Sequence, residues 1–154
     1  MTVGLSTDAA PTQPAYDPHN IFARILRGEL PCHAVLDDAC VLAMMDVMPR
    51  VPGHVLVVPR SPCRNLLDAP PDVLATLLPR VQRVGRAVMA AFEAPGLIVQ
   101  QFNEVAAGQT VFHLHVHLLP RHDGVPLGPL ATSMAEPEML AEHARRIRDA
   151  LAAA

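Results

Sequence analysis

The chain has 154 residues, of which 51% are hydrophobic and 18% are charged, as is typical of a soluble globular domain with a buried core. Its formal net charge is −3, and all 12 basic residues are arginines that form no run. Because binding to a nucleic-acid backbone needs a clustered basic surface, we expect no nucleic-acid partner. No apolar stretch reaches the length of a membrane span, so we expect no membrane partner either.

Two features of the sequence bear on the compartment. The three cysteines, Cys32, Cys40 and Cys63, are odd in number and form no C-x-x-C pair, which favours reduced thiols. Residues 1–17 are rich in proline and small polar residues and lack the apolar core of a signal peptide. We therefore predict a flexible N-terminal tail over 1–17 and a cytoplasmic location.

The first predicted elements are short. Residues 21–28 carry hydrophobic side chains at helical spacing and end at a glycine, which predicts a short helix. Strands are predicted over 35–36, 40–45 and 54–58, each followed by a turn residue or a proline.

The longest helix is predicted over 72–93, where Pro79 should kink or split it because proline removes a hydrogen bond. Its apolar face is expected to consist of Leu74, Leu77, Leu78, Val81, Val84, Val88 and Phe92. Strands over 97–102 and 110–119 form a predicted hairpin, and residues 136–152 a C-terminal helix. The predicted fold class is α+β: an antiparallel sheet of about five strands with one main helix packed on it, plus a short N-terminal and a C-terminal helix.

Three histidines, His113, His115 and His117, alternate with apolar residues in the second strand of this hairpin. Because successive side chains of a strand point to opposite faces, the three imidazoles should share one face, about 6.5–7 Å apart. The apolar residues between them would then point into the core and hold the row on a rigid scaffold.

This row has two chemical interpretations, since imidazole is both a zinc ligand and a nucleophile. A catalytic zinc site usually has a carboxylate nearby, but neither Glu104 nor Asp123 has an obvious place on the same face. The row is instead preceded by the sequence AGQT, in which Gly108 lets backbone N–H groups turn toward an anion. Gln109 and Thr110 add uncharged donors. Donors beside an imidazole favour a phosphoryl group as ligand.

The stretch NEVAAGQTVFHLHVHLLPR, residues 103–121, resembles the signature of the histidine triad (HIT) family, in which three histidines alternate with apolar residues. Further segments fall in the family's order and spacing: IFARILRGELPC (21–32), MMDVMPRVPGHVLVVPR (44–60) and LIVQQFN (97–103). The chain is similar to bacterial members close to nucleoside phosphoramidases and diadenosine polyphosphate hydrolases. We therefore expect a HIT domain over 18–125, followed by a C-terminal extension, 126–154, that contains a helix.

The resemblance implies that His115 attacks the α-phosphorus of a nucleoside phosphoramidate or dinucleoside polyphosphate. A nucleotidyl-histidine would form, and water would release the nucleoside monophosphate. The residue type agrees, because a histidine of ordinary pKa, about 6.5, is largely neutral and nucleophilic at pH 7. One ring nitrogen must stay free for phosphorus, so the other must donate a hydrogen bond, with a backbone carbonyl as the expected acceptor.

The resemblance also implies roles for the neighbours of His115. His117 and Gln109 would contact the phosphate or the leaving oxygen, with help from Thr110. His113 and His54 would support and orient the central imidazole.

For the nucleotide, the resemblance implies that Asn103 and Gly108 lie at the phosphate or ribose and that Asp46 accepts hydrogen bonds from the ribose hydroxyls. The purine pocket would be formed by Ile21, Phe22, Ile25, Val47 and Leu56. From the residues alone, Asp46 and Asn103 could equally be turn residues, His54 a strand start, and the apolar residues plain core.

The sequence departs from the family where some bacterial members hold a structural zinc. Their ligands are two cysteines in a C-I-F-C pattern, a later histidine and the first triad histidine. Here Asn20 and Ala23 stand at the cysteine positions and Pro62 at the later histidine position. Because three of the four ligands are missing, we predict no metal and no other cofactor.

Three functional hypotheses stay open from the sequence: a hydrolase, a nucleotide-binding regulatory or scaffold protein with little turnover, and a metalloprotein with three histidine ligands. The expected small-molecule partner is a purine nucleotide. The resemblance further implies a homodimer, which the long apolar helix face and the unpaired sheet edges weakly support.

Overall fold

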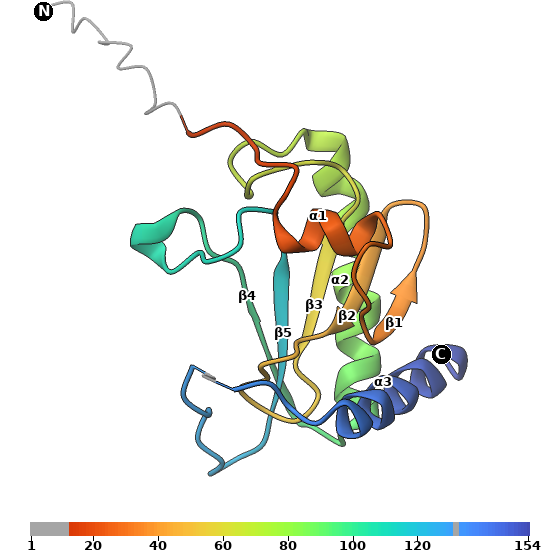
Figure 1. Cartoon of the computed structure of the whole chain (residues 1–154). Helices are drawn as coiled ribbons and strands as arrows, with labels where there is room; N and C mark the ends of the chain where they lie inside the picture. Colours follow the sequence, from red (N-terminus) through yellow and green to blue (C-terminus); the bar gives the residue numbers. More distant parts are fainter. Residues whose placement is uncertain (1–12, 131–132) are drawn as a thin grey trace, which may run out of the picture.

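The structure, a computed structural model, describes residues 13–130 and 133–154 and is built on an antiparallel sheet (Figure 1). The sheet has five strands: β1 (Ala34–Asp37), β2 (Val41–Met45), β3 (Val55–Pro59), β4 (Gly96–Gln100) and β5 (Val116–Arg121). Their order across the sheet is β1-β2-β3-β5-β4, and every neighbouring pair is antiparallel. The predicted α+β class with about five strands is confirmed.

The described part of the chain has three α-helices and one 3₁₀ turn: α1 (Ile21–Leu26), α2 (Pro71–Ala91), α3 (Pro137–Ala152) and η1 (Val105–Ala107). The side chain of Asn20 caps α1 by accepting a hydrogen bond from the N–H of Ala23 (2.9 Å). Both α2 and α3 begin with a proline, whose missing N–H would be unpaired at a first helical turn in any case. None of these helices is long and apolar enough to cross a membrane.

Side-chain alternation along the strands divides the core between the two faces of the sheet. The face covered by α2 and α3 holds the larger cluster, to which β2, β3 and β5 with its preceding residues contribute Val41, Ala43, Met45, Val55, Val57, Leu114, Val116 and Leu118. The other face, under α1, carries a smaller cluster of Phe22, Leu42, Met44, Leu56 and Val58. The apolar residues between the histidines thus point to the α2 face, as the alternation predicted.

The main helix differs from its prediction in two ways. It continues unbroken through Pro79. Proline has no N–H to donate to the carbonyl oxygen of Ala75, but both residues lie on the exposed side of the helix, where water can bond to that oxygen. Leu78 is predicted on the apolar face but is 62% exposed. The buried face of α2 follows Leu77 and Val81, and Leu78 points away from this face.

The strand that carries the histidines is shorter than predicted. Residues 110–115 are not part of β5, because the pairing of β5 with β3 stops at Val116 opposite Val57, although β3 itself continues to Pro59. The N–H of Leu114 donates instead to the carbonyl oxygen of Cys63 (2.8 Å). His113 and His115 therefore precede β5, and His117 lies within it.

The two ends of the chain pack on the domain as far as they are described. Residues 1–12 of the predicted tail lie outside the described residues, but Gln13 donates to Asn65 and Tyr16 contacts His113. The predicted C-terminal helix is present as α3, which packs against α2 and β1 and buries Leu140, Ala144, Ile147 and Leu151. The segment predicted as an extension thus completes the larger core cluster.

We expect Ile147→Ala to lower the free energy of unfolding by about 2–5 kcal/mol, because this fully buried side chain joins α3 to the core. Urea unfolding followed by circular dichroism measures the loss. The matched control is Asp149→Ala on the exposed side of α3, for which a change within about 0.5 kcal/mol is expected. Equal stability of the Ile147 variant and the wild type would show that α3 is not needed for the core.

Candidate functional site

The three histidines of the row lie on the α1 face of the sheet. Phe22 of α1 stands edge-on to His115, with ring centroids 4.9 Å apart, and the rings of His115 and His117 are also 4.9 Å apart. Both His113 and His115 are buried, at 1% and 8% exposure, while His117 is partly exposed. The predicted common side is therefore present, although only His117 lies in a regular strand.

The hydrogen bonds of His115 define its tautomer. Its Nδ1 lies 2.6 Å from the carbonyl oxygen of His113, which can only accept, so Nδ1 carries the proton. In the neutral ring the lone pair is then on Nε2. Burial lowers the pKa of His115, and the bond to the carbonyl oxygen partly offsets this, so the neutral form is favoured at pH 7. The arrangement provides the free nitrogen that nucleophilic attack requires.

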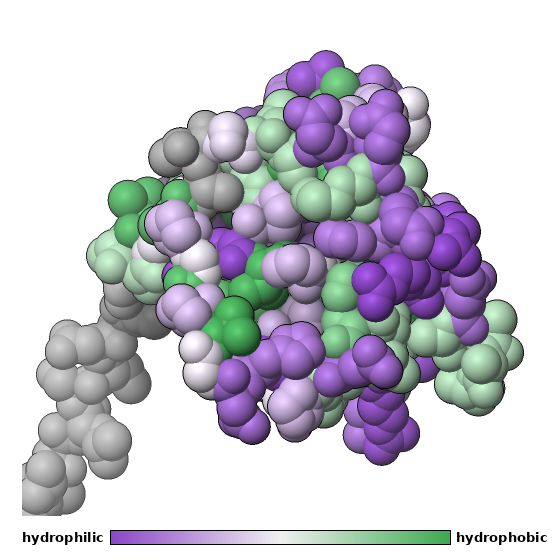
Figure 2. All heavy atoms as spheres, turned by 90° about the horizontal axis from the view of Figure 1, so that it is seen from below, coloured by the Kyte–Doolittle hydropathy of each residue, from purple (hydrophilic) through white to green (hydrophobic). Residues whose placement is uncertain are grey.

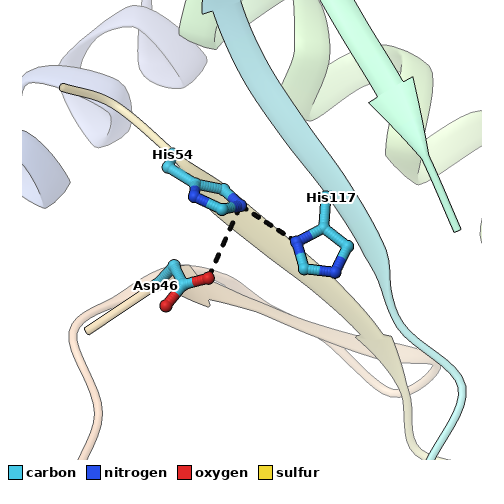
Figure 3. A group of neighbouring side chains, drawn as sticks. All are labelled: Asp46, His54 and His117. Carbon is cyan, nitrogen blue, oxygen red and sulfur yellow. Dashed lines mark hydrogen bonds and ion pairs between the residues drawn. The ribbon is translucent and has the colours of Figure 1, made fainter. Parts of the chain in front are cut away.

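Asp46, His54 and His117 form a second group on the same side, at the ends of three neighbouring strands (Figure 3). Asp46 stands beside His54 and donates its backbone N–H to the carbonyl oxygen of His54 (3.0 Å). Because Leu56 is paired with His117, His54 is the diagonal neighbour of His117 across β3 and β5. The Nε2 atom of His54 lies 3.0 Å from Nδ1 of His117 and 3.5 Å from a carboxylate oxygen of Asp46.

A backbone N–H group determines which ring nitrogens of His54 and His117 carry a proton. The N–H of Arg50 donates to Nδ1 of His54 (3.2 Å), so neutral His54 carries its proton on Nε2. That proton is directed at Nδ1 of His117, which must accept. Neutral His117 therefore has its proton on Nε2 and can donate it to a ligand.

Burial controls the charge of both residues. Burial, together with the nearby charges of Arg50 and His115, lowers the pKa of His54 to about 4. Burial, together with the charges of His115, His54 and Arg50, lowers the pKa of His117 to about 3. Burial also raises the pKa of Asp46, against the hydrogen bond that this carboxylate accepts from Met48. Both histidines are consequently neutral at pH 7.

The loop before the histidines is fixed by a network of buried polar groups. Arg64 donates to both carboxylate oxygens of Glu104 (2.7 and 2.9 Å), and Asn65 donates to Glu104 and to Gln109. The amide of Gln109 also donates to the carbonyls of Arg64 and Val111 and accepts from the N–H of Glu104. Both of its N–H bonds are used, so the predicted phosphate contact of this side chain is wrong for this conformation. Gln109 instead supports the loop.

Two backbone conformations shape the same loop. Gly108 has a φ of +97°, in the left-handed region that favours glycine, so the turn beside the histidines needs this residue type. Glu104 has a φ of +68°, which costs energy in a residue with a side chain and is held by the ion pair to Arg64. Thr110 is exposed at the end of the loop, and the amide oxygen of Asn103 accepts from the N–H of Leu66.

The residues predicted to line a purine pocket do not all come together. Phe22, Ile25 and Leu56 meet on the α1 face, close to His115. Ile21 is 47% exposed, and Val47 packs with the cluster on the opposite face. The assignment of Val47 to the pocket is wrong, because the alternation along β2 and the residues after it turns this side chain toward α2 and α3.

Two other predictions of contact are changed by the geometry. His54 supports His117 and not His115, and His113 holds His115 through its backbone carbonyl rather than its ring. Sequence reasoning missed Arg64 because its partner Glu104 lies 40 residues away. It missed Tyr16 because this residue falls in the predicted tail.

The described residues offer one cluster close enough for a cation, in which the ligand atoms of Asp46, His54 and His117 lie within 4.8 Å of one another. The facing nitrogens of its two histidines already bond to each other, which satisfies them without an ion. The residues at the zinc position of the family do not fit zinc. Asn20 caps α1 there, and the ring nitrogens of His113 face the Tyr16 hydroxyl and the Pro59 carbonyl oxygen.

A family model for the HIT domain matches residues 27–124. The chain belongs to the histidine triad family. This confirms the resemblance seen in the sequence. Among the similar solved structures are a histidine triad nucleotide-binding protein from Sulfolobus tokodaii and a HIT family hydrolase from Clostridium thermocellum.

Three relatives illustrate the similarity. A crystal structure of a HIT-like protein involved in cell-cycle regulation from Bartonella henselae is 47% identical, covers 89% of this chain and 99% of its own, and has a TM-score of 0.86. A zinc-bound histidine triad protein from Mycobacterium smegmatis is 32% identical, covers 88% of this chain and 94% of its own, and has a TM-score of 0.78. The adenylylsulfatase HINT3 of Arabidopsis thaliana is 33% identical over 67% of this chain and 52% of its own.

The lowered pKa values of His54 and His117 predict that this HIT protein loses stability as the pH falls. The unfolded chain takes up protons on these residues below about pH 6.5, while the folded chain does so only near pH 4 and 3. Each histidine should therefore contribute stability that is complete above about pH 6.5. Below that, it should be lost at up to about 1.4 kcal/mol per pH unit.

Urea unfolding from about pH 7 to about pH 5 measures this dependence. His117→Gln should have a shallower pH dependence than the wild type, while His19→Gln, at an exposed position, controls for loss of a histidine elsewhere. An unchanged slope in His117→Gln would contradict the assigned burial effect.

Proposed function

We propose that this HIT protein is a hydrolase that cleaves the α-phosphate bond of nucleoside phosphoramidates or dinucleoside polyphosphates, with His115 as the nucleophile. The proposal rests on two adjacent imidazoles, 4.9 Å apart between ring centroids, whose Nε2 atoms have opposite protonation states. Nε2 of His115 has a free lone pair because Nδ1 donates to a carbonyl, and Nε2 of the adjacent His117 carries a proton. A phosphoryl group between them would meet a nucleophile and a hydrogen-bond donor.

The reaction proceeds in two displacements. The Nε2 lone pair of His115 forms a bond to the α-phosphorus, and the bond from phosphorus to the leaving nitrogen or oxygen breaks with its electron pair on the leaving group. Water then attacks the nucleotidyl-histidine, releases the nucleoside monophosphate and returns the lone pair to His115. Splitting one displacement into two lowers each barrier.

The main contribution of the other groups is to position the phosphate and to stabilise its charge. The Nε2–H of His117 donates to a phosphoryl or leaving oxygen. An anion there raises the pKa of His117, so that the protonated ring passes a proton to the leaving group and takes one back from the attacking water in the second displacement. The turn at Gly108, with Asn103 and Thr110, provides further polar groups at the phosphate.

The nucleoside is held on the α1 face. The purine lies against Phe22, Ile25 and Leu56, and the carboxylate of Asp46 accepts hydrogen bonds from the ribose. The name of the Arabidopsis relative, adenylylsulfatase, is consistent with substrates that carry an adenylyl group. The three free thiols favour a reducing compartment, and we propose the cytoplasm as the site of action.

A second candidate function is nucleotide binding with little turnover, in a regulatory or scaffold role. The Arg64–Glu104 ion pair favours this second function, because it holds the loop beside the histidines in one conformation, and a fixed loop can bind a nucleotide without any turnover. Calorimetry that finds tight binding of adenosine monophosphate, together with negligible turnover of every substrate tested, would favour this function.

We expect His115→Ala to abolish turnover of adenosine phosphoramidate and diadenosine tetraphosphate, because no other imidazole presents its free nitrogen in the same place. His115→Ala should still bind adenosine monophosphate by calorimetry. His19→Ala, which removes an exposed histidine, is the matched control and should keep wild-type rates. Rapid quenching of the wild type should trap a protein whose mass is increased by one nucleotidyl group. Wild-type turnover by His115→Ala would remove this residue from the mechanism.

We also propose a homodimer formed through the free edge of β4, where Val99 is 53% exposed. Val125, Leu130 and Met134 add exposed hydrophobic side chains in the segment after β5. Figure 2 shows the most strongly hydrophobic residues of one face at the left and centre-left of the view, with paler hydrophobic residues among the hydrophilic ones elsewhere.

Val99→Lys should shift the wild-type dimer to a monomer with an unchanged circular dichroism spectrum, because two lysines would face each other across the interface. Light scattering after size exclusion measures the mass. Met139→Lys, on α3, is the control and should stay dimeric. A monomeric wild type would refute the proposal.

A further inference from the structure

A tyrosine from the segment before α1 reaches the first histidine of the triad. The hydroxyl of Tyr16 lies 2.6 Å from Nδ1 of His113, across 97 residues of chain, and the two rings stand edge-on with centroids 5.6 Å apart. His113 is only 1% exposed. A buried imidazole needs partners for both nitrogens, so this contact satisfies a group that could not turn to water.

The second nitrogen of His113 fixes the direction of the bond. Nε2 lies 2.8 Å from the carbonyl oxygen of Pro59, which can only accept, so the ring proton is on Nε2. Nδ1 then has a lone pair, and the Tyr16 hydroxyl donates to it. Burial raises the pKa of Tyr16, which keeps the phenol protonated, and burial lowers the pKa of His113, which keeps the imidazole neutral.

The same histidine is a ligand in those bacterial family members that hold a structural zinc. Here the zinc position carries Asn20, Ala23 and Pro62, and both nitrogens of His113 are taken. A cavity of about 290 Å³ opens beside this position, lined by Tyr16, Arg27, Arg60, Pro62 and His113 among others. The His113 ring itself is almost fully covered, so the packing around it and the two hydrogen bonds together fix its orientation.

We propose that Tyr16 is a positioning residue for His113: its hydroxyl fixes the orientation and tautomer of the ring. The effect continues to the nucleophile, because the backbone carbonyl of His113 accepts the Nδ1 proton of His115. The consequence for catalysis rests on the proposed function, whereas the consequence for the imidazole does not.

The segment that carries Tyr16 is tied down independently of its hydroxyl. Gln13 donates to Asn65 (3.3 Å), and Arg27 donates to the carbonyl oxygen of Pro18 (2.7 Å). Removing only the hydroxyl should therefore leave the segment in place. Removing the Gln13 amide takes away one attachment but leaves both the Arg27 bond and the Tyr16 hydroxyl, so His113 should keep its partner. These two substitutions separate the hydrogen bond from the attachment of the segment.

The test compares Tyr16→Phe with the wild type and with Gln13→Ala as the matched control. The first measurement is the ¹⁵N nuclear magnetic resonance signal of His113 Nδ1 at neutral pH. In Tyr16→Phe this signal should move downfield, toward the position of an imidazole nitrogen without a hydrogen bond, and in Gln13→Ala it should stay at the wild-type position. An unmoved signal in Tyr16→Phe would overturn the proposal.

The second measurement is turnover of adenosine phosphoramidate. Tyr16→Phe should lower kcat by about tenfold, the effect of losing one hydrogen bond, with KM changed less than about twofold. Gln13→Ala should keep the wild-type kcat. An equal fall of kcat in both variants would assign the effect to the attached segment and refute a role for the hydroxyl. If the wild type turned over no substrate, the proposed function would fail while the resonance measurement still decided the role of Tyr16.

Discussion

A buried neutral imidazole has one protonated nitrogen and one bare nitrogen, and in His115 the bond from Nδ1 to the carbonyl oxygen of His113 decides which is which. The acceptor lies two residues away in the segment that leads into β5, so the backbone conformation of this segment sets the bond. The sheet, the loop network and the apolar residues beneath all hold this segment in place. Together they therefore set the direction of the lone pair on Nε2 of His115.

Burial has a second effect on the site, because it keeps several close imidazoles uncharged. The rings of His115 and His117 are 4.9 Å apart, and His54 bonds to His117, so two protonated rings would repel each other. An anionic ligand changes this balance, since a negative charge near the rings raises their pKa values. Binding of a phosphate and uptake of a proton are therefore coupled.

Much of this could be predicted from the sequence, and the part that could not is long-range. Alternation alone placed Leu114 and Val116 in the core and the histidines on the other side. It could not locate the start of β5, because that depends on where the pairing with β3 stops, at Val57 and Val116. Nor could local patterns pair Arg64 with Glu104 or bring Tyr16 to His113, since folding creates these contacts between distant residues.

The register between β3 and β5 has a consequence for how the site is lost or kept. A slip of one residue would bring Val57 opposite His117 and turn His54 away from the α1 face, toward the apolar cluster under α2. Such a misaligned chain would separate His54 from His117 and place a polar imidazole among apolar side chains. The free energy that selects the native register therefore also brings His54 and His117 together, so every correctly folded molecule contains this pair.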